Sequence, residues 1–151
     1  MKVKASLLVK KVPNRTEFQQ LAELRIREAK IAFDNGCFEG AYYLAGYAIE
    51  CALKACIAKR TRAGDFPRPP NEIGQIYSHK FPDLFRHTDI EAMRDQEMKK
   101  NEAFDRNWGV VKDWSEETRY LTSIPESDAR ELLNAITDTE NGVLPWLKKL
   151  W

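Results

Sequence analysis

The segment GAYYLAGYAIECALKACIAK, residues 40–59, constrains the fold more than any other, because it is apolar on nearly every side. The first ten of these residues carry no charge, the segment contains no proline, and Ala and Leu are frequent. These features predict a helix from about Phe38 to Arg62. A helix that is apolar nearly all round lies at the centre of a bundle.

A narrow polar stripe interrupts this apolar surface. At about 100° per residue, the side chains of Tyr43, Tyr47, Glu50 and Lys54 fall within about 60° of one another on the helix. The stripe therefore combines one carboxylate and one ammonium with two tyrosines. An all-apolar helix needs none of these groups for packing alone, so the stripe is the first candidate for a functional or interface surface.

Two interpretations of the stripe remain open from the sequence. On a solvated face, Glu50 and Lys54 would form an ordinary i,i+4 ion pair that contributes roughly 0.2–0.5 kcal/mol. Under a cover, both charges need partners, because an uncompensated buried charge costs several kcal/mol. We expect shielding, with pairing to each other or to Arg119, His79 or a tyrosine hydroxyl. A covered stripe would line either a structural interface or a ligand cleft.

The remaining sequence predicts further helices and almost no strand. A capping box at Thr16 and a stop at Asn35-Gly36 bound the first helix. Helical patterns follow at about residues 16–34, 38–62, 78–88, 89–114 and 123–148, with a proline-rich loop at 63–75. The segment from residue 89 is expected to break near Gly109. Ser123 is expected to cap the last segment, and Asn141-Gly142 and Pro145 are expected to bend or interrupt it. The sequence therefore predicts an all-α protein, an antiparallel bundle of four to five helices in a single domain over residues 1–151. Residues 1–14 are left as a loose arm, a short strand or a helical turn.

Composition excludes several classes of function. Lys and Arg total 24 against 23 for Asp and Glu, so the net charge of +1 does not indicate a strong polyanion binder. Three cysteines without CxxC and only two histidines leave no spacing for metal ligands, and we expect no metal and no cofactor. No apolar run reaches the roughly 20 residues that span a bilayer. The apolar core of residues 1–13 is three residues long, and we expect it to be too short for a secretory signal. We expect no membrane association and a cytoplasmic location.

Three segments resemble a known family. GCFEGAYYLAGYAIECALKACIAK, residues 36–59, closely resembles the second-helix signature of HEPN domains (higher eukaryotes and prokaryotes nucleotide-binding), with Ala-Tyr-Tyr before an Ala-rich helix that places Glu four residues ahead of Lys. SHKFPDLF, residues 78–85, looks like the segment that opens a later helix in that family. NWGVVKDWSEETRY, residues 107–120, looks like the Trp-rich stretch of bacterial members.

The resemblance implies a helical bundle that forms a homodimer and often pairs with a minimal nucleotidyltransferase in toxin–antitoxin or defence systems. Active members are metal-independent ribonucleases that use Arg-x(4–6)-His. This sequence departs from that motif, because no arginine precedes His79 or His87 at the required distance. We therefore expect a non-catalytic HEPN-like dimer that binds a nucleotide, an RNA or a protein. The alternative is a ribonuclease whose catalytic groups have moved to Lys54, His79 and Arg119.

The candidate binding site combines the stripe with residues from later segments. Arg119-Tyr120 supplies a cation beside an aromatic ring, the pairing that stacks on bases and contacts phosphates in proteins that bind single strands. His79 is the better placed of the two histidines, although such a residue often only caps a helix. The sequence assigns no catalytic residue, and the candidate binding residues are Tyr43, Tyr47, Glu50, Lys54, His79, Arg119 and Tyr120.

Overall fold

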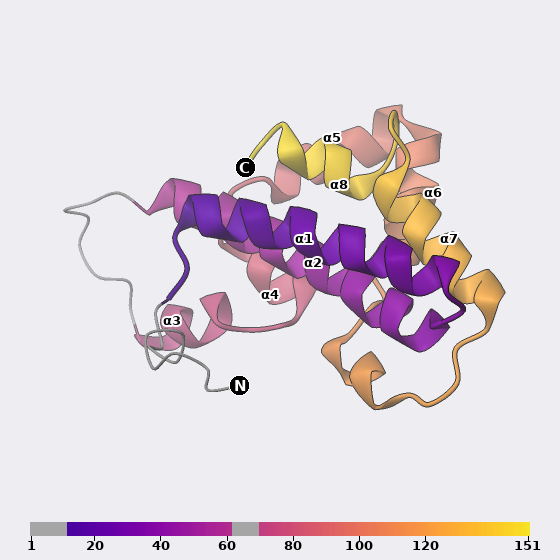
Figure 1. Cartoon of the computed structure of the whole chain (residues 1–151). Helices are drawn as coiled ribbons and strands as arrows, with labels where there is room; N and C mark the ends of the chain where they lie inside the picture. Colours follow the sequence, from indigo (N-terminus) through magenta and orange to yellow (C-terminus); the bar gives the residue numbers. More distant parts are fainter. Residues whose placement is uncertain (1–11, 62–69) are drawn as a thin grey trace, which may run out of the picture.

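The computed structural model describes residues 12–61 and 70–151, and every regular element in these ranges is helical. Eight α-helices and one 3-10 helix make up this part of the chain (Figure 1). The predicted all-α class is confirmed, and the helices form a bundle. Most of the predicted arm, residues 1–11, lies outside the described residues. None of the described helices is long and apolar enough to cross a bilayer.

The first helix, α1 (Arg15–Asp34), has a capping box two residues earlier than the sequence predicted. Asn14 and Glu17 form it, because the Glu17 amide donates to Asn14 Oδ1 at 2.9 Å and the Asn14 amide donates to Glu17 Oε2 at 2.8 Å. The assignment of the cap to Thr16 was wrong. The predicted stop is confirmed, since Asn35 caps the helix and Gly36 follows in the left-handed region at φ 75°.

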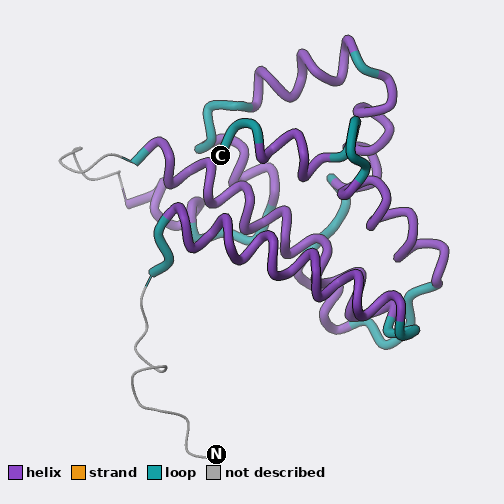
Figure 2. The backbone as a smooth tube through the Cα atoms, turned by 45° about the horizontal axis from the view of Figure 1, so that its top comes forward, coloured by secondary structure: helices purple, strands orange, loops and turns teal. Residues whose placement is uncertain are grey.

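The second helix, α2 (Phe38–Arg60), occupies the centre of the bundle as predicted. Twelve of its 23 residues are buried, from Ala41 to Ile57. It runs antiparallel to α1, and the two form a long hairpin joined by a short turn (Figures 1 and 2). The helix ends at Arg60, close to the predicted end, and residue 62 lies outside the described part of the chain.

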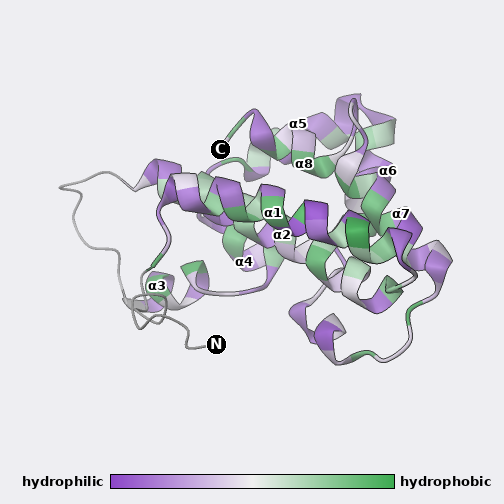
Figure 3. Ribbon diagram, in the orientation of Figure 1, coloured by the Kyte–Doolittle hydropathy of each residue, from purple (hydrophilic) through white to green (hydrophobic). Residues whose placement is uncertain are grey.

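The later helices pack around this hairpin. They are α3 (Pro70–Ile76), α4 (Phe81–Arg86), α5 (Glu91–Lys100), α6 (Glu102–Val111), the 3-10 helix η2 (Glu116–Tyr120), α7 (Glu126–Thr137) and α8 (Val143–Lys148). Helices α4, α7 and α8 and the element η2 all contact α2, and α6 packs on α7. Figure 3 shows hydrophobic residues along α1, α2 and the helices around them, mixed with hydrophilic ones. The core therefore surrounds one central helix.

Three predicted boundaries in the later part of the chain were wrong. The predicted loop at 63–75 is helical from Pro70 onward. The long pattern from residue 89 breaks at Asn101, not at Gly109, because the Asn101 side chain accepts from the Phe104 amide at 3.1 Å and caps α6. The last long helix begins after Pro125, so Ser123 is not its cap.

Candidate functional site

Glu50 is buried within the polar stripe of α2 and holds two partners on one oxygen. Only 2% of its side chain is exposed. Its Oε1 accepts from Lys54 Nζ at 2.8 Å, one helical turn along α2, and lies 2.8 Å from His79 Nδ1. The expectation that Glu50 is shielded and paired with Lys54 and His79 is therefore confirmed. Lys54 itself is largely covered, with 15% of its side chain exposed.

His79 reaches Glu50 from the connection between α3 and α4. Ser78 shapes this connection, because its Oγ accepts from the Lys80 amide at 3.0 Å and donates to Asp83 Oδ2 at 3.0 Å. About half of the His79 side chain (49%) is exposed. With a carboxylate facing Nδ1, the neutral ring carries its proton there and leaves Nε2 as an acceptor. Within the described ranges, Nε2 makes no hydrogen bond.

The second carboxylate oxygen of Glu50 lacks a partner among the described residues, although it is buried. An ionised carboxylate accepts on both oxygens, and a buried acceptor left unsatisfied costs roughly 1–3 kcal/mol. Lys54 and His79 both bind the other oxygen. The site therefore retains capacity for one more donor beside α2, such as an ordered water.

Tyr43 and Tyr47 form the aromatic half of the stripe. Their rings stack at 6.1 Å between centroids, and the guanidinium of Arg25 lies 5.8 Å from the Tyr47 ring centroid. Burial raises the pKa of the Tyr47 phenol, and the neighbouring Cys51 and Glu50 groups raise it further. The phenol is therefore neutral and able to donate. Sequence reasoning missed Arg25. The available signal was a cation next to the buried apolar residues of α1.

Trp114 covers the middle of α2 and extends the stack of rings. Its ring lies 6.1 Å from Tyr43 and 5.3 Å from Phe81, and its Nε1 donates to the Tyr42 carbonyl at 3.2 Å. Gly46 permits this approach, since a Cβ there would stand 2.1 Å from the Trp114 ring. Sequence reasoning did not place Trp114 in the site. The available signal was a glycine in the interior of a long helix, which marks a close approach.

The candidate pair Arg119 and Tyr120 belongs to η2, which lies against α2. Glu39 of α2 holds the following segment, because its Oε1 accepts from the Ile124 amide at 3.1 Å. Arg119 lies 4.9 Å from the Tyr120 ring centroid. The neighbouring phenols, Tyr120 first and then Tyr43, raise the pKa of the Arg119 guanidinium. The pair is thus exposed to solvent and also joined to the stripe through Tyr43.

The structure brings the seven candidate residues together through two sets of contacts. Glu50, Lys54 and His79 form one hydrogen-bonded cluster, and the two tyrosines of α2 connect to Arg119 and Tyr120. Arg119 contacts tyrosines and makes no described bond to Glu50. We call the resulting surface the α2 strip, formed by Tyr43, Tyr47, Lys54, His79, Arg119 and Tyr120.

The α2 strip interleaves cations with aromatic rings and places the only deeply buried carboxylate of the described residues beneath them. Such a surface suits a ligand that offers both an anionic group and a planar ring. Within residues 12–61 and 70–151, no group of three or more His, Cys, Asp or Glu side chains is placed to hold a metal ion. Comparisons with protein-family models, curated proteins and solved structures found no match for this chain.

Proposed function

We propose that this protein is a HEPN-like dimeric helical module that binds single-stranded RNA or a nucleotide through the α2 strip, without catalysis. The observation that carries the proposal is the alternation of cations and aromatic side chains along one surface, which is the arrangement that binds single strands. The resemblance of residues 36–59 to the second-helix signature of HEPN domains points in the same direction.

Each part of the strip has a separate task in this proposal. Tyr120, 72% exposed, offers a ring face to a base. Arg119 lies beside that ring and contacts a phosphate, as guanidinium groups do well. Lys54 supplies a second cationic position beside the His79 ring, and buried Glu50 fixes both side chains in place. Glu50 is therefore a positioning residue under the ligand surface.

The wider role follows from the resemblance. We infer an interaction with a minimal nucleotidyltransferase in a toxin–antitoxin or defence system, with RNA or a nucleotide as the bound anion. A protein partner would use the same strip through acidic groups. Co-purification of the protein with the products of its flanking genes tests this part, and a stable complex with a nucleotidyltransferase is the expected result.

Fluorescence anisotropy with a short, labelled single-stranded RNA tests the binding surface. Tyr120→Ala should weaken binding by about 5- to 100-fold, because stacking on one base contributes roughly 1–3 kcal/mol. Arg119→Ala should weaken it too and reduce its salt dependence. Arg106→Ala is the matched control, since Arg106 is exposed on α6 and lies outside the strip. Equal effects of Arg106→Ala and Arg119→Ala would reject the proposed surface.

Competition separates the two ligand classes. If an unlabelled mononucleotide displaces the labelled RNA at concentrations similar to those at which unlabelled RNA does, the strip is a nucleotide site. A strong preference for the longer RNA indicates a site that reads several linked nucleotides. Failure of both to bind the wild-type protein would overturn the proposal.

A second function, metal-independent RNA cleavage, is favoured by the hydrogen bond between Glu50 and His79. A carboxylate that orients a half-exposed imidazole leaves Nε2 free to take or give a proton. Incubation of labelled RNA with the protein and a chelator tests this alternative. Cleavage that is lost in His79→Ala and kept in Arg106→Ala would replace the non-catalytic proposal. RNA that stays intact at a concentration that saturates binding would support the non-catalytic proposal.

A further inference from the structure

His79 is a titratable group that the α2 strip presents in a fixed orientation. Its Nδ1 lies 2.8 Å from Glu50 Oε1, and 49% of its side chain is exposed. No other described residue bonds to the ring, so Nε2 is left for a ligand. An ordinary imidazole titrates at about pH 6.5, within the range in which proteins work. The charge at this position therefore depends on the pH and on the group that binds to Nε2.

The charges of the Glu50 cluster cancel while the His79 ring is neutral. Glu50 supplies a negative charge and Lys54 a positive charge, and the two side chains join at 2.8 Å. A neutral imidazole whose Nδ1 proton faces the carboxylate presents the Nε2 lone pair on its other edge. A phosphate oxygen, which is also an acceptor, meets neither a net charge from the cluster nor a donor on the ring. The neutral ring therefore opposes contact with a phosphate.

Protonation of His79 reverses both properties. The imidazolium keeps the hydrogen bond from Nδ1 to Glu50 and gains an N–H donor at Nε2. The cluster of Glu50, Lys54 and the charged ring then carries a net positive charge, equal in size to the negative charge of a single phosphodiester group. Hydrogen bonds in which both groups are charged are also shorter and stronger than neutral ones. The charged ring therefore favours contact with a phosphate.

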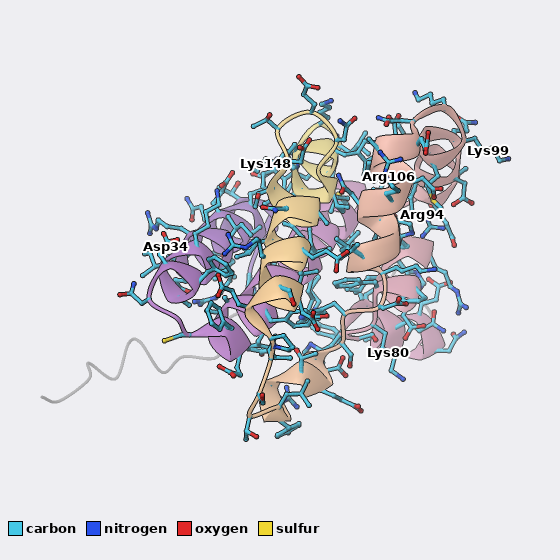
Figure 4. All side chains as sticks on the ribbon, turned by 90° about the vertical axis from the view of Figure 1, so that its right-hand side faces the viewer. Asp34, Lys80, Arg94, Lys99, Arg106 and Lys148 are labelled. Atoms are coloured by element: carbon cyan, nitrogen blue, oxygen red, sulfur yellow. The ribbon has the colours of Figure 1, made fainter. Side chains whose placement is uncertain are left out.

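Other charges close to His79 along the chain do not replace this proton. Lys80 is the next residue and is exposed (Figure 4), and on α4 the Asp83 Oδ1 atom lies 3.9 Å from Arg86 Nη1. Water and salt screen charges that are as exposed as those of Lys80 and Arg86. None of these three side chains bonds to His79 in the described part of the chain. The ring itself is the group whose charge decides the contact.

We propose that His79 contacts a phosphate of the bound RNA as an imidazolium, so that binding of RNA to the α2 strip takes up a proton from solvent at Nε2. Glu50 orients the ring and compensates its charge, and the Nε2 proton is donated to a phosphate oxygen. Because protonation and binding favour each other, the affinity for RNA falls as the pH rises. This inference rests on RNA binding by the proposed function and adds the ionic state in which the site binds.

Fluorescence anisotropy with the labelled RNA, between about pH 6 and 8 and at constant ionic strength, tests the inference. Wild-type affinity should fall with rising pH, by up to about tenfold for each pH unit, as linkage to a single proton requires. His79→Gln should bind more weakly at the acid end and lose most of this slope, because an amide cannot become charged. His79→Lys should also lose the slope, yet bind more tightly than His79→Gln at the alkaline end, because its ammonium stays charged.

His87→Gln is the matched control and should keep the wild-type slope, because His87 follows α4 and its Nε2 lies 2.7 Å from Gln75 Oε1, outside the strip.

Isothermal titration calorimetry of the wild type makes the test independent of any variant that fails to fold. RNA binding at a pH above about 7, measured in two buffers of different ionisation enthalpy, should show net uptake of protons. RNA binding without proton uptake, or a slope that persists in His79→Gln, would overturn this inference and leave the proposed RNA surface intact. Absence of RNA binding at every pH would overturn the proposed function as well.

Discussion

Two ion pairs of the same sequence spacing lie in opposite surroundings. Glu50 and Lys54 on α2 bond at 2.8 Å, and Glu102 and Arg106 on α6 bond at 2.7 Å. The first pair has 2% and 15% of its side chains exposed, whereas the second has 87% and 65%. Figure 4 labels Arg106 on α6. Spacing and bond length are thus nearly equal, whereas the exposure of the two pairs differs.

The difference shows that spacing alone does not set the energetic role of a pair. Water solvates the exposed pair before and after it separates, so its net contribution is small. The α2 pair has lost that water, and each of its charges depends on protein partners. His79 supplies the additional partner from another part of the chain. Neighbouring elements therefore convert a common helical pair into a structural centre.

Lys54→Met should produce the largest effect of the changes that test this comparison. It leaves the buried Glu50 carboxylate with His79 alone, and removal of one partner from a buried pair costs about 3–5 kcal/mol. Urea unfolding of the variant and the wild type measures the loss. Arg106→Met on the exposed pair is the matched control. Similar losses in both variants would show that the two pairs do not differ.

Glu50→Gln should cost less, about 1–3 kcal/mol, because Lys54 and half-exposed His79 retain some access to water. The same unfolding measurement tests it. The double variant with Lys54→Met should recover part of the summed losses, since neither charge is then stranded. Coupling of about 1 kcal/mol or more is expected for residues in one network. Simple additivity would contradict the network around Glu50.

Alkaline pH should lower the free energy of unfolding, and at about pH 9 this loss should be smaller than the losses caused by the substitutions above. Burial raises the pKa of the Cys51 thiol to about 12 from 9.0, and the pKa of Tyr47 is also raised. The folded state holds these protons more tightly than the unfolded chain. Stability is therefore lost as pH rises above about 9, by up to about 1.4 kcal/mol for each pH unit from Cys51.

Thermal unfolding at pH values between about 8 and 10.5 measures this slope. Cys51→Ala should flatten it by removing one of the tightly held protons. Cys37→Ala is the control, because Cys37 is exposed and lies at the start of α2, in the turn that follows α1. Slopes that match in all three proteins would show that Cys51 does not contribute.

Glu102→Gln should produce the smallest effect, below about 0.5 kcal/mol, as expected for an exposed i,i+4 pair. Its loss should shrink further in high salt, because salt screens exposed charges. The effect of Lys54→Met should persist in the same salt. Urea unfolding at low and high salt makes this test, and a salt-independent Glu102→Gln loss would place the α6 pair in the same class as the α2 pair.

The central helix and its polar stripe were predictable because both depend on periodicity within one segment. Apolar residues on nearly every side of α2 indicated burial, and burial of Glu50 required partners. The covering role of Trp114 was not predictable, since it depends on contact with Gly46 across 67 intervening positions of sequence. Arg25 was missed for the same reason, because its position over Tyr47 depends on how α1 packs on α2.

The sequence by itself determined the helical class, the position of α2 at the centre, the stop at Gly36 and the set of chemical groups along the stripe. These features depend on local backbone preferences and on a period of 3.6 residues. Tertiary structure alone decided that His79 completes the Glu50 cluster, that η2 carries Arg119 to Tyr43, and that Glu102 and Arg106 stay in water. Burial depends on which elements meet, and that is a property of the folded chain as a whole.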